Sequence, residues 1–85
     1  MSAAIEYRHL RSLTARELVR ALLRDGLILV HQKGSHQRFR HPDGRRVSVA
    51  LHHPGDTYPV KTLKTIIEEQ ARWTESDLKR LGLLK

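Results

Sequence analysis

The stretch GLILVHQKGSHQRFRHPDGRRVSVAL, residues 26–51, decides the fold. It begins with a short apolar run of β-forming residues and ends with a run that alternates apolar and polar positions. Two turn signals divide it: Gly34 permits a tight reversal, and in residues 42–44 proline fixes φ while glycine accepts positive φ. The pattern predicts three sequential antiparallel strands, at about 27–32, 36–41 and 45–51.

Helical signals flank this stretch on both sides. Thr14 and Glu17 have the spacing of a capping box, ahead of apolar residues at helical spacing, and predict a helix at about 15–25. A second apolar pattern predicts a helix at about 60–71, and Thr74 begins a short third helix. The order α-β-β-β-α-α predicts an α+β two-layer sandwich, a three-stranded antiparallel sheet with helices on one face.

Size, composition and cysteine content restrict the class of protein. With 85 residues, 39% of them hydrophobic, the chain fits one small folded domain. Residues 1–13 carry little pattern, so we expect an N-terminal arm there and a single domain over 14–85. The absence of cysteine excludes disulfides and thiolate metal sites. No apolar run reaches membrane-spanning length and no apolar leader occurs, so we expect a cytoplasmic protein.

The charge balance indicates a polyanionic partner. Sixteen Lys and Arg stand against nine Asp and Glu, which gives a formal net charge of +7. Most of these cations are arginines, whose planar guanidinium suits bidentate phosphate contact. RNA or DNA is the common polyanion for so basic a domain. A basic surface that is merely solvated is the alternative.

Alternation along the second predicted strand divides its side chains between two faces. Phe39 is the only large apolar residue there and should point to the core. His36, Arg38 and Arg40 then share the opposite face, about 6.6–6.8 Å apart by the strand repeat. Nucleic-acid phosphates repeat at a similar spacing, although an ordinary solvated sheet face would show the same pattern.

The histidines allow three interpretations: metal ligands, polar surface residues, or a catalytic group. Metal binding is disfavoured because cysteine is absent and alternation places His36 and His41 on opposite faces. We therefore expect no metal site and no cofactor. Taken singly, His31, His41 and His53 are expected to be polar surface residues beside a polyanion site.

His36 differs because it follows Gly34-Ser35 directly, at the start of the second strand. A glycine lets the backbone approach a ligand closely, and histidine transfers protons near neutral pH. RNA carries its own nucleophile, the 2′-OH, so a base beside cationic groups can cleave it without metal. Lys33, Arg38 and Arg40 are placed to hold the phosphate, and Ser35 to position the loop and hydrogen-bond RNA. His52, after the third strand, is a candidate for the second proton-transfer group.

The ordered string G-x-x-x-x-H-Q-x-G-S-H-x-x-F, with its following P-x-G turn and valine strand, resembles the HicA toxins of bacterial toxin–antitoxin systems. A His-Pro loop and an L-x-x-I helix come next, so the resemblance covers about residues 14–73. It implies a fold similar to double-stranded-RNA-binding domains and a metal-independent endoribonuclease (mRNA interferase). It also implies His36 as the catalytic histidine and a HicB-type antitoxin that masks the active site. Many members have a second histidine where this chain has Gln37, which leaves open how the chemistry proceeds here.

Two other functions remain open from the residues alone. A non-catalytic RNA- or DNA-binding module could use the same basic sheet face, with steeply salt-dependent affinity. An interaction subunit could instead present its charge to an acidic partner protein. Replacement of His36 separates the first from a nuclease, because it should abolish cleavage and leave RNA affinity nearly intact.

Overall fold

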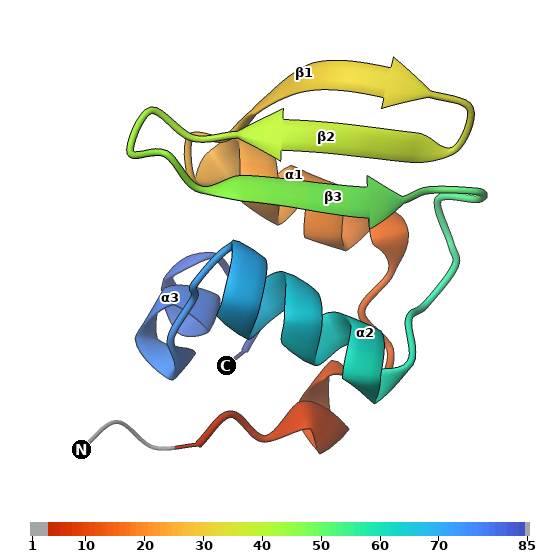
Figure 1. The fold of residues 1–85 in the computed structure, drawn as a ribbon. Helices are drawn as coiled ribbons and strands as arrows, with labels where there is room; N and C mark the ends of the chain where they lie inside the picture. The colour runs from red at the N-terminus through yellow and green to blue at the C-terminus, as the bar shows by residue number, and fades with distance from the viewer. Residues whose placement is uncertain (1–3, 85) are drawn as a thin grey trace.

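The fold, seen in a computed structural model that describes residues 4–84, has the predicted two layers (Figure 1). The antiparallel sheet has the order β1-β2-β3, and α1 lies behind it in this view. The α+β fold and the predicted order of its elements are thus confirmed. The elements in chain order are η1 (Tyr7–Leu10), α1 (Ala15–Arg24), β1 (Ile28–Lys33), β2 (His36–Arg40), β3 (Arg46–Ala50), α2 (Val60–Lys64), η2 (Thr65–Gln70) and α3 (Glu75–Arg80).

Local hydrogen bonds start α1 and α3 where the sequence predicts. The Thr14 hydroxyl accepts from the Glu17 backbone N–H at 3.2 Å, and the Glu17 carboxylate accepts from the Thr14 N–H at 3.0 Å. Thr74 and Asp77 form the same reciprocal pair, so aspartate replaces the more usual glutamate. These boxes satisfy amides that would lack partners in the first turn of each helix.

The second predicted helix is only partly α-helical. Its α-helical turns end at Lys64, and η2 continues it as a π-helix, closed by an Ala71 N–H that donates to the carbonyl of Ile66, five residues back, at 2.8 Å. Arg72 then adopts a left-handed φ of +56° and redirects the chain. The predicted helix over 60–71 is therefore present, but its second half is π-helical, because apolar spacing does not distinguish an α-turn from a π-turn.

The core lies between the sheet and the helices. Phe39, Val47 and Val49 are buried there, as the alternation predicts, whereas Leu51 is only half-buried. Leu10 of η1 is also buried, so the described part of the N-terminal segment contacts the core. Residues 1–3 of the predicted arm and Lys85 of the predicted domain lie outside the described residues, and the boundary at 13/14 stays a prediction. Within residues 4–84, no helix is long and apolar enough to cross a membrane.

Candidate functional site

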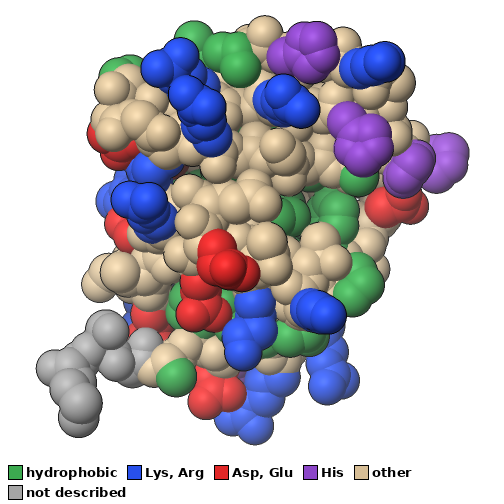
Figure 2. Space-filling view, viewed as in Figure 1, with side chains coloured by type: hydrophobic (Ala, Val, Ile, Leu, Met, Phe, Trp, Pro, Cys, Tyr) green, Lys and Arg blue, Asp and Glu red, His purple; other side chains and the backbone are tan. Residues whose placement is uncertain are grey.

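One face of the sheet is left uncovered by helices. On β2, the side chains of His36, Arg38 and Arg40 are exposed on this face while Phe39 between them is buried. The register of β3 places Ala50, Ser48 and Arg46 opposite those three residues, on the same face. Figure 2 shows Lys, Arg and His side chains spread over the three strands, with acidic side chains lower in the view and at its margins. We call this surface the open face.

A β-bulge brings Lys33 onto the open face. Leu29 pairs with Phe39 but His31 pairs with Arg38, so Val30 is the extra residue between them. Strict alternation from Ile28 would turn Lys33 toward the helices. The bulge reverses this, and Lys33 becomes the cross-strand neighbour of His36 on the same face.

The reversal between β1 and β2 holds His36 in place. Gly34 has φ +59° at the first central position of a two-residue turn, where type II′ turns require positive φ. Ser35 is half-buried, and its carbonyl accepts a hydrogen bond from the Leu51 N–H at 2.7 Å. This bond ties the turn to the end of β3, immediately before His52.

His36 and His52 line one groove between the sheet and the helix that follows it. Neither ring has a hydrogen bond or an ion pair with any described residue from 4 to 84. The Tyr58 hydroxyl donates to the Ala50 carbonyl at 2.7 Å, and burial, with the nearby Asp56 charge, raises the pKa of this tyrosine. The other polar residues of the groove are Ser48, Asp56, Thr57, Thr62, Thr65 and Gln70.

Sequence reasoning anticipated His52 from its place after the third strand but not the residues opposite it. Gln70 closes the groove through its side-chain oxygen, which accepts from the Ser48 N–H at 2.7 Å. Gln70 and Thr65 belong to the π-helical segment, and no sequence signal of such a segment was available.

The cations of the open face are free of acidic partners. Among residues 4–84, no ion pair involves Lys33, Arg38, Arg40 or Arg46. Arg38, Arg40 and Arg46 instead surround a shallow depression in the middle of the sheet, together with His31 and Ser48. An arrangement of unpaired guanidinium groups on a wet surface is suited to binding phosphate groups.

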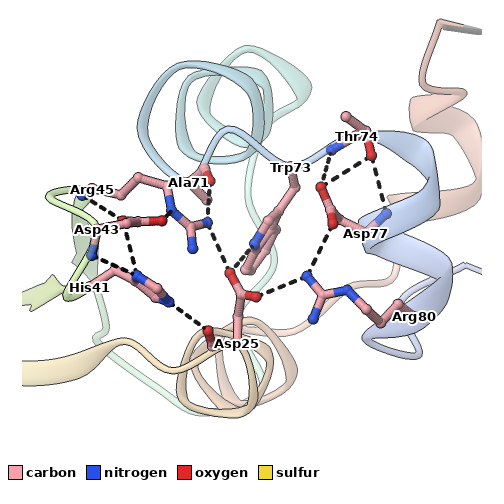
Figure 3. Close-up of polar contacts among 9 residues, drawn as sticks. All are labelled: Asp25, His41, Asp43, Arg45, Ala71, Trp73, Thr74, Asp77 and Arg80. Carbon is pink, nitrogen blue, oxygen red and sulfur yellow. Dashed lines mark hydrogen bonds and ion pairs between the residues drawn. The ribbon is translucent and has the colours of Figure 1, made fainter.

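The opposite end of β2 is closed by a polar network (Figure 3). The Asp25 carboxylate, with 8% of its side chain exposed, accepts from Arg45 at 2.9 Å, from Trp73 at 2.8 Å and from Arg80 at 2.8 Å. Burial alone would raise the pKa of Asp25, but these three hydrogen bonds outweigh it and lower the pKa. Arg45 also donates to the Ala71 carbonyl at 2.7 Å. The network thus joins α1, the β2–β3 turn and the segment before α3.

His41 belongs to this network rather than to the open face. Its Nε2 lies 3.0 Å from the Asp25 carbonyl, and its Nδ1 accepts from the Asp43 N–H at 3.0 Å. A Cβ added at Gly26, where φ is +98°, would lie 3.1 Å from Nε2, so the ring lies close against this glycine. The expectation that His41 is a polar surface residue is wrong, because the ring is half-buried and both nitrogens have partners; His31 and His53 are exposed as expected.

Between residues 4 and 84, no group of three or more His, Asp or Glu side chains could hold an ion. The open face offers imidazole, ammonium and guanidinium groups as its chemistry.

Comparison with known proteins identifies the family. No curated protein sequence matches the chain. A family model described as the HicA toxin of bacterial toxin–antitoxin systems matches residues 15–73, from the start of α1 to Trp73. This match covers the sheet, the groove and the G-S-H turn, and extends over more than half of the chain. The chain therefore belongs to the HicA toxin family, and it is the toxin of a toxin–antitoxin system with an antitoxin partner.

Proposed function

We propose that this toxin is a metal-independent endoribonuclease that cleaves mRNA in the cytoplasm and that His36 is its catalytic histidine. The observation that carries the proposal is the Lys33–His36 cross-strand pair on the open face. This pair sets an imidazole beside an ammonium group, at an exposed turn that a polynucleotide can reach. The activity of the family and the G-S-H motif support the same assignment.

The proposed reaction begins at the ribose. The imidazole of His36 takes the proton of the 2′-OH, and the 2′-oxygen then attacks the adjacent phosphorus. The bond from phosphorus to the 5′-oxygen breaks, and a proton passes to that oxygen. The products are a 2′,3′-cyclic phosphate and a 5′-OH end, so RNA supplies the nucleophile and the reaction needs neither metal nor cofactor.

The cations of the open face stabilise the charge that develops on the phosphate. Lys33 lies opposite His36, and Arg38 follows two residues along the same face. Arg40 extends this row and would contact the next phosphate of the strand. Ser35 holds the turn through its carbonyl, and we propose that its hydroxyl hydrogen-bonds RNA. Fixed donors of this kind stabilise a phosphorane more strongly than water does.

We assign the second proton transfer to His52, because it lines the same groove as His36. His53 is exposed but does not line the groove, and it therefore provides a matched control. His52→Ala should slow cleavage by about 10²-fold or more, as expected for loss of a general acid, while His53→Ala should not. Equal rates for the two variants would exclude this role.

The test of the main proposal compares His36→Ala with His53→Ala, since both histidines are exposed and His53 lines neither the groove nor the depression. Purified protein is incubated with labelled RNA in the presence of EDTA. His36→Ala should lose cleavage and keep its RNA affinity, and His53→Ala should keep both. RNA with 2′-deoxyribose at the cleaved position should bind and stay intact. Cleavage by His36→Ala at the parent rate would contradict the proposal.

A non-catalytic RNA- or DNA-binding module is the alternative that the same face supports. In that case, the parent protein would bind RNA with steep salt dependence and release no product. In either case, the partner antitoxin, which we take to be of the HicB type, would silence the toxin by covering the open face with acidic side chains.

A further inference from the structure

The two edges of the sheet are treated differently by the rest of the chain. On the β3 edge, the Ser48 N–H donates to Gln70 and the Ala50 carbonyl accepts from Tyr58. The β1 edge has no such cover, since β1 is the terminal strand of the sheet and no described segment pairs with its outer side. All six residues of β1 are exposed.

The first half of this uncovered strand consists of apolar residues, although a solvent-exposed edge usually carries polar ones. Ile28 is 61%, Leu29 44% and Val30 53% exposed, and they are consecutive. Natural proteins protect their edge strands with charges, prolines, bulges or short length, because unpaired N–H and C=O groups invite another strand. β1 has a bulge at Val30 and a charge at Lys33, but residues 28–30 contain neither a charge nor a proline. Three consecutive large apolar residues on an open edge therefore indicate an interaction surface.

The exposure of Leu29 shows that both sides of β1 are open. Leu29 pairs with Phe39 and shares its inward-pointing face, yet Phe39 is buried and Leu29 is not. The helix layer thus covers the face below β2 but leaves the same face of β1 uncovered. A partner can contact this strand along its edge and from beneath.

We propose that β1 is the docking strand for the antitoxin, which pairs a β-strand of its own with this edge. Main-chain hydrogen bonds would supply affinity, and the exposed apolar side chains of β1 would fill pockets of the partner. The proposal uses the membership of this chain in a toxin–antitoxin family and does not depend on the ribonuclease chemistry.

Charge argues against a second copy of this chain as the partner on this edge. Two copies would bring together chains of net charge +7 each, and the cations of the open face lie next to β1. An acidic partner meets no such repulsion. A strand added to β1 would also lie within about 10 Å of β2, since adjacent strands are about 4.8 Å apart. Acidic side chains on that strand could then reach Lys33 and shield His36.

The experiment measures the affinity of purified antitoxin from the same system for toxin variants. All variants also carry His36→Ala, so that RNA cleavage cannot affect the measured affinity. Val30→Lys places a charge on the docking edge, and Val60→Lys places the same charge on an exposed valine, 41% exposed, at the start of α2. Val30→Lys should weaken binding by about tenfold or more, and Val60→Lys by less than about twofold. Ile28→Lys should reproduce the loss, and thermal melts should show that all variants fold.

Two results would overturn the proposal. Equal affinity of folded Val30→Lys and Val60→Lys for the antitoxin would mean that the antitoxin docks elsewhere. Sedimentation that shows a dimer of the parent toxin, dissociated by Val30→Lys, would assign the edge to a second copy. A toxin that binds antitoxin through β1 but does not cleave RNA would leave this proposal intact and exclude only the ribonuclease.

Discussion

His36 and His41 stand at the two ends of β2, and the same side chain has opposite surroundings at each. His36 is exposed, and its ring has no partner among the described residues. His41 is half-buried, and both ring nitrogens are engaged. A histidine whose nitrogens are occupied is unavailable as a base, whereas a free one in a groove can meet a substrate. The comparison separates an end of the strand that stabilises the fold from an end that is open to a ligand.

The closed end depends on Asp25, whose replacement should have the largest effect on stability. Asp25→Ala removes the acceptor shared by Trp73, Arg45 and Arg80 and leaves the indole N–H and the Arg45 guanidinium without it. Removal of one member of a buried charged group costs about 3–5 kcal/mol of unfolding free energy. Urea denaturation would measure this loss. His36→Ala is the control at the open end and should change stability by less than about 0.5 kcal/mol.

His41→Ala should destabilise the protein less than Asp25→Ala, because the ring contacts two backbone groups and the half-exposed Asp43 carboxylate, and no buried charge loses its partner. The Asp25 carbonyl and the Asp43 N–H lose their partner, at a cost of about 1–3 kcal/mol. RNA cleavage per folded molecule should remain at the parent level. The comparison between the two histidines fails if His41→Ala impairs cleavage while the urea midpoint is unchanged.

Acid should weaken the closed end of β2. The network lowers the pKa of Asp25, and a hydrogen bond from the Thr74 N–H lowers the pKa of Asp77. A lowered pKa in the folded state means that these groups stabilise the fold above the unfolded pKa of about 4 and lose this effect as pH falls through the folded value. Melting temperature should therefore fall steadily below about pH 4. Asp25→Asn, which cannot ionise, should show a shallower fall, and an unchanged slope would contradict the assignment.

The extent to which the sequence anticipated the structure depends on the range of the interactions. Capping boxes span three residues and strand alternation spans two, so α1, α3 and the core positions of β2 and β3 could be predicted. The partners of Asp25 lie 20 to 55 residues away, and nothing in the pattern around the end of α1 indicated them.

The candidate site also has parts that local sequence predicts and parts that depend on distant contacts. His36 follows from a local motif, and its exposure follows from alternation. Lys33 was expected beside it, but its actual face depends on a bulge at Val30 that the residues between Ile28 and Lys33 do not reveal. One wall of the groove is formed by the π-helical segment, which lies across from β3. This placement depends on contacts between distant parts of the chain and could not be predicted from the local sequence.

The smallest expected effect concerns Arg72, which lies between Ala71 and Trp73, two members of the network. Arg72 has φ +56°, a left-handed conformation that costs a residue with a Cβ about 1–2 kcal/mol and costs glycine little. Arg72 is exposed, so Arg72→Gly should lose few contacts and raise the unfolding free energy by up to about 1 kcal/mol, or about 4–8 °C in melting temperature. Arg72→Ala keeps the Cβ and should give no such gain. A loss of stability in Arg72→Gly would show that the side chain, and not only the backbone turn, supports the closed end of β2.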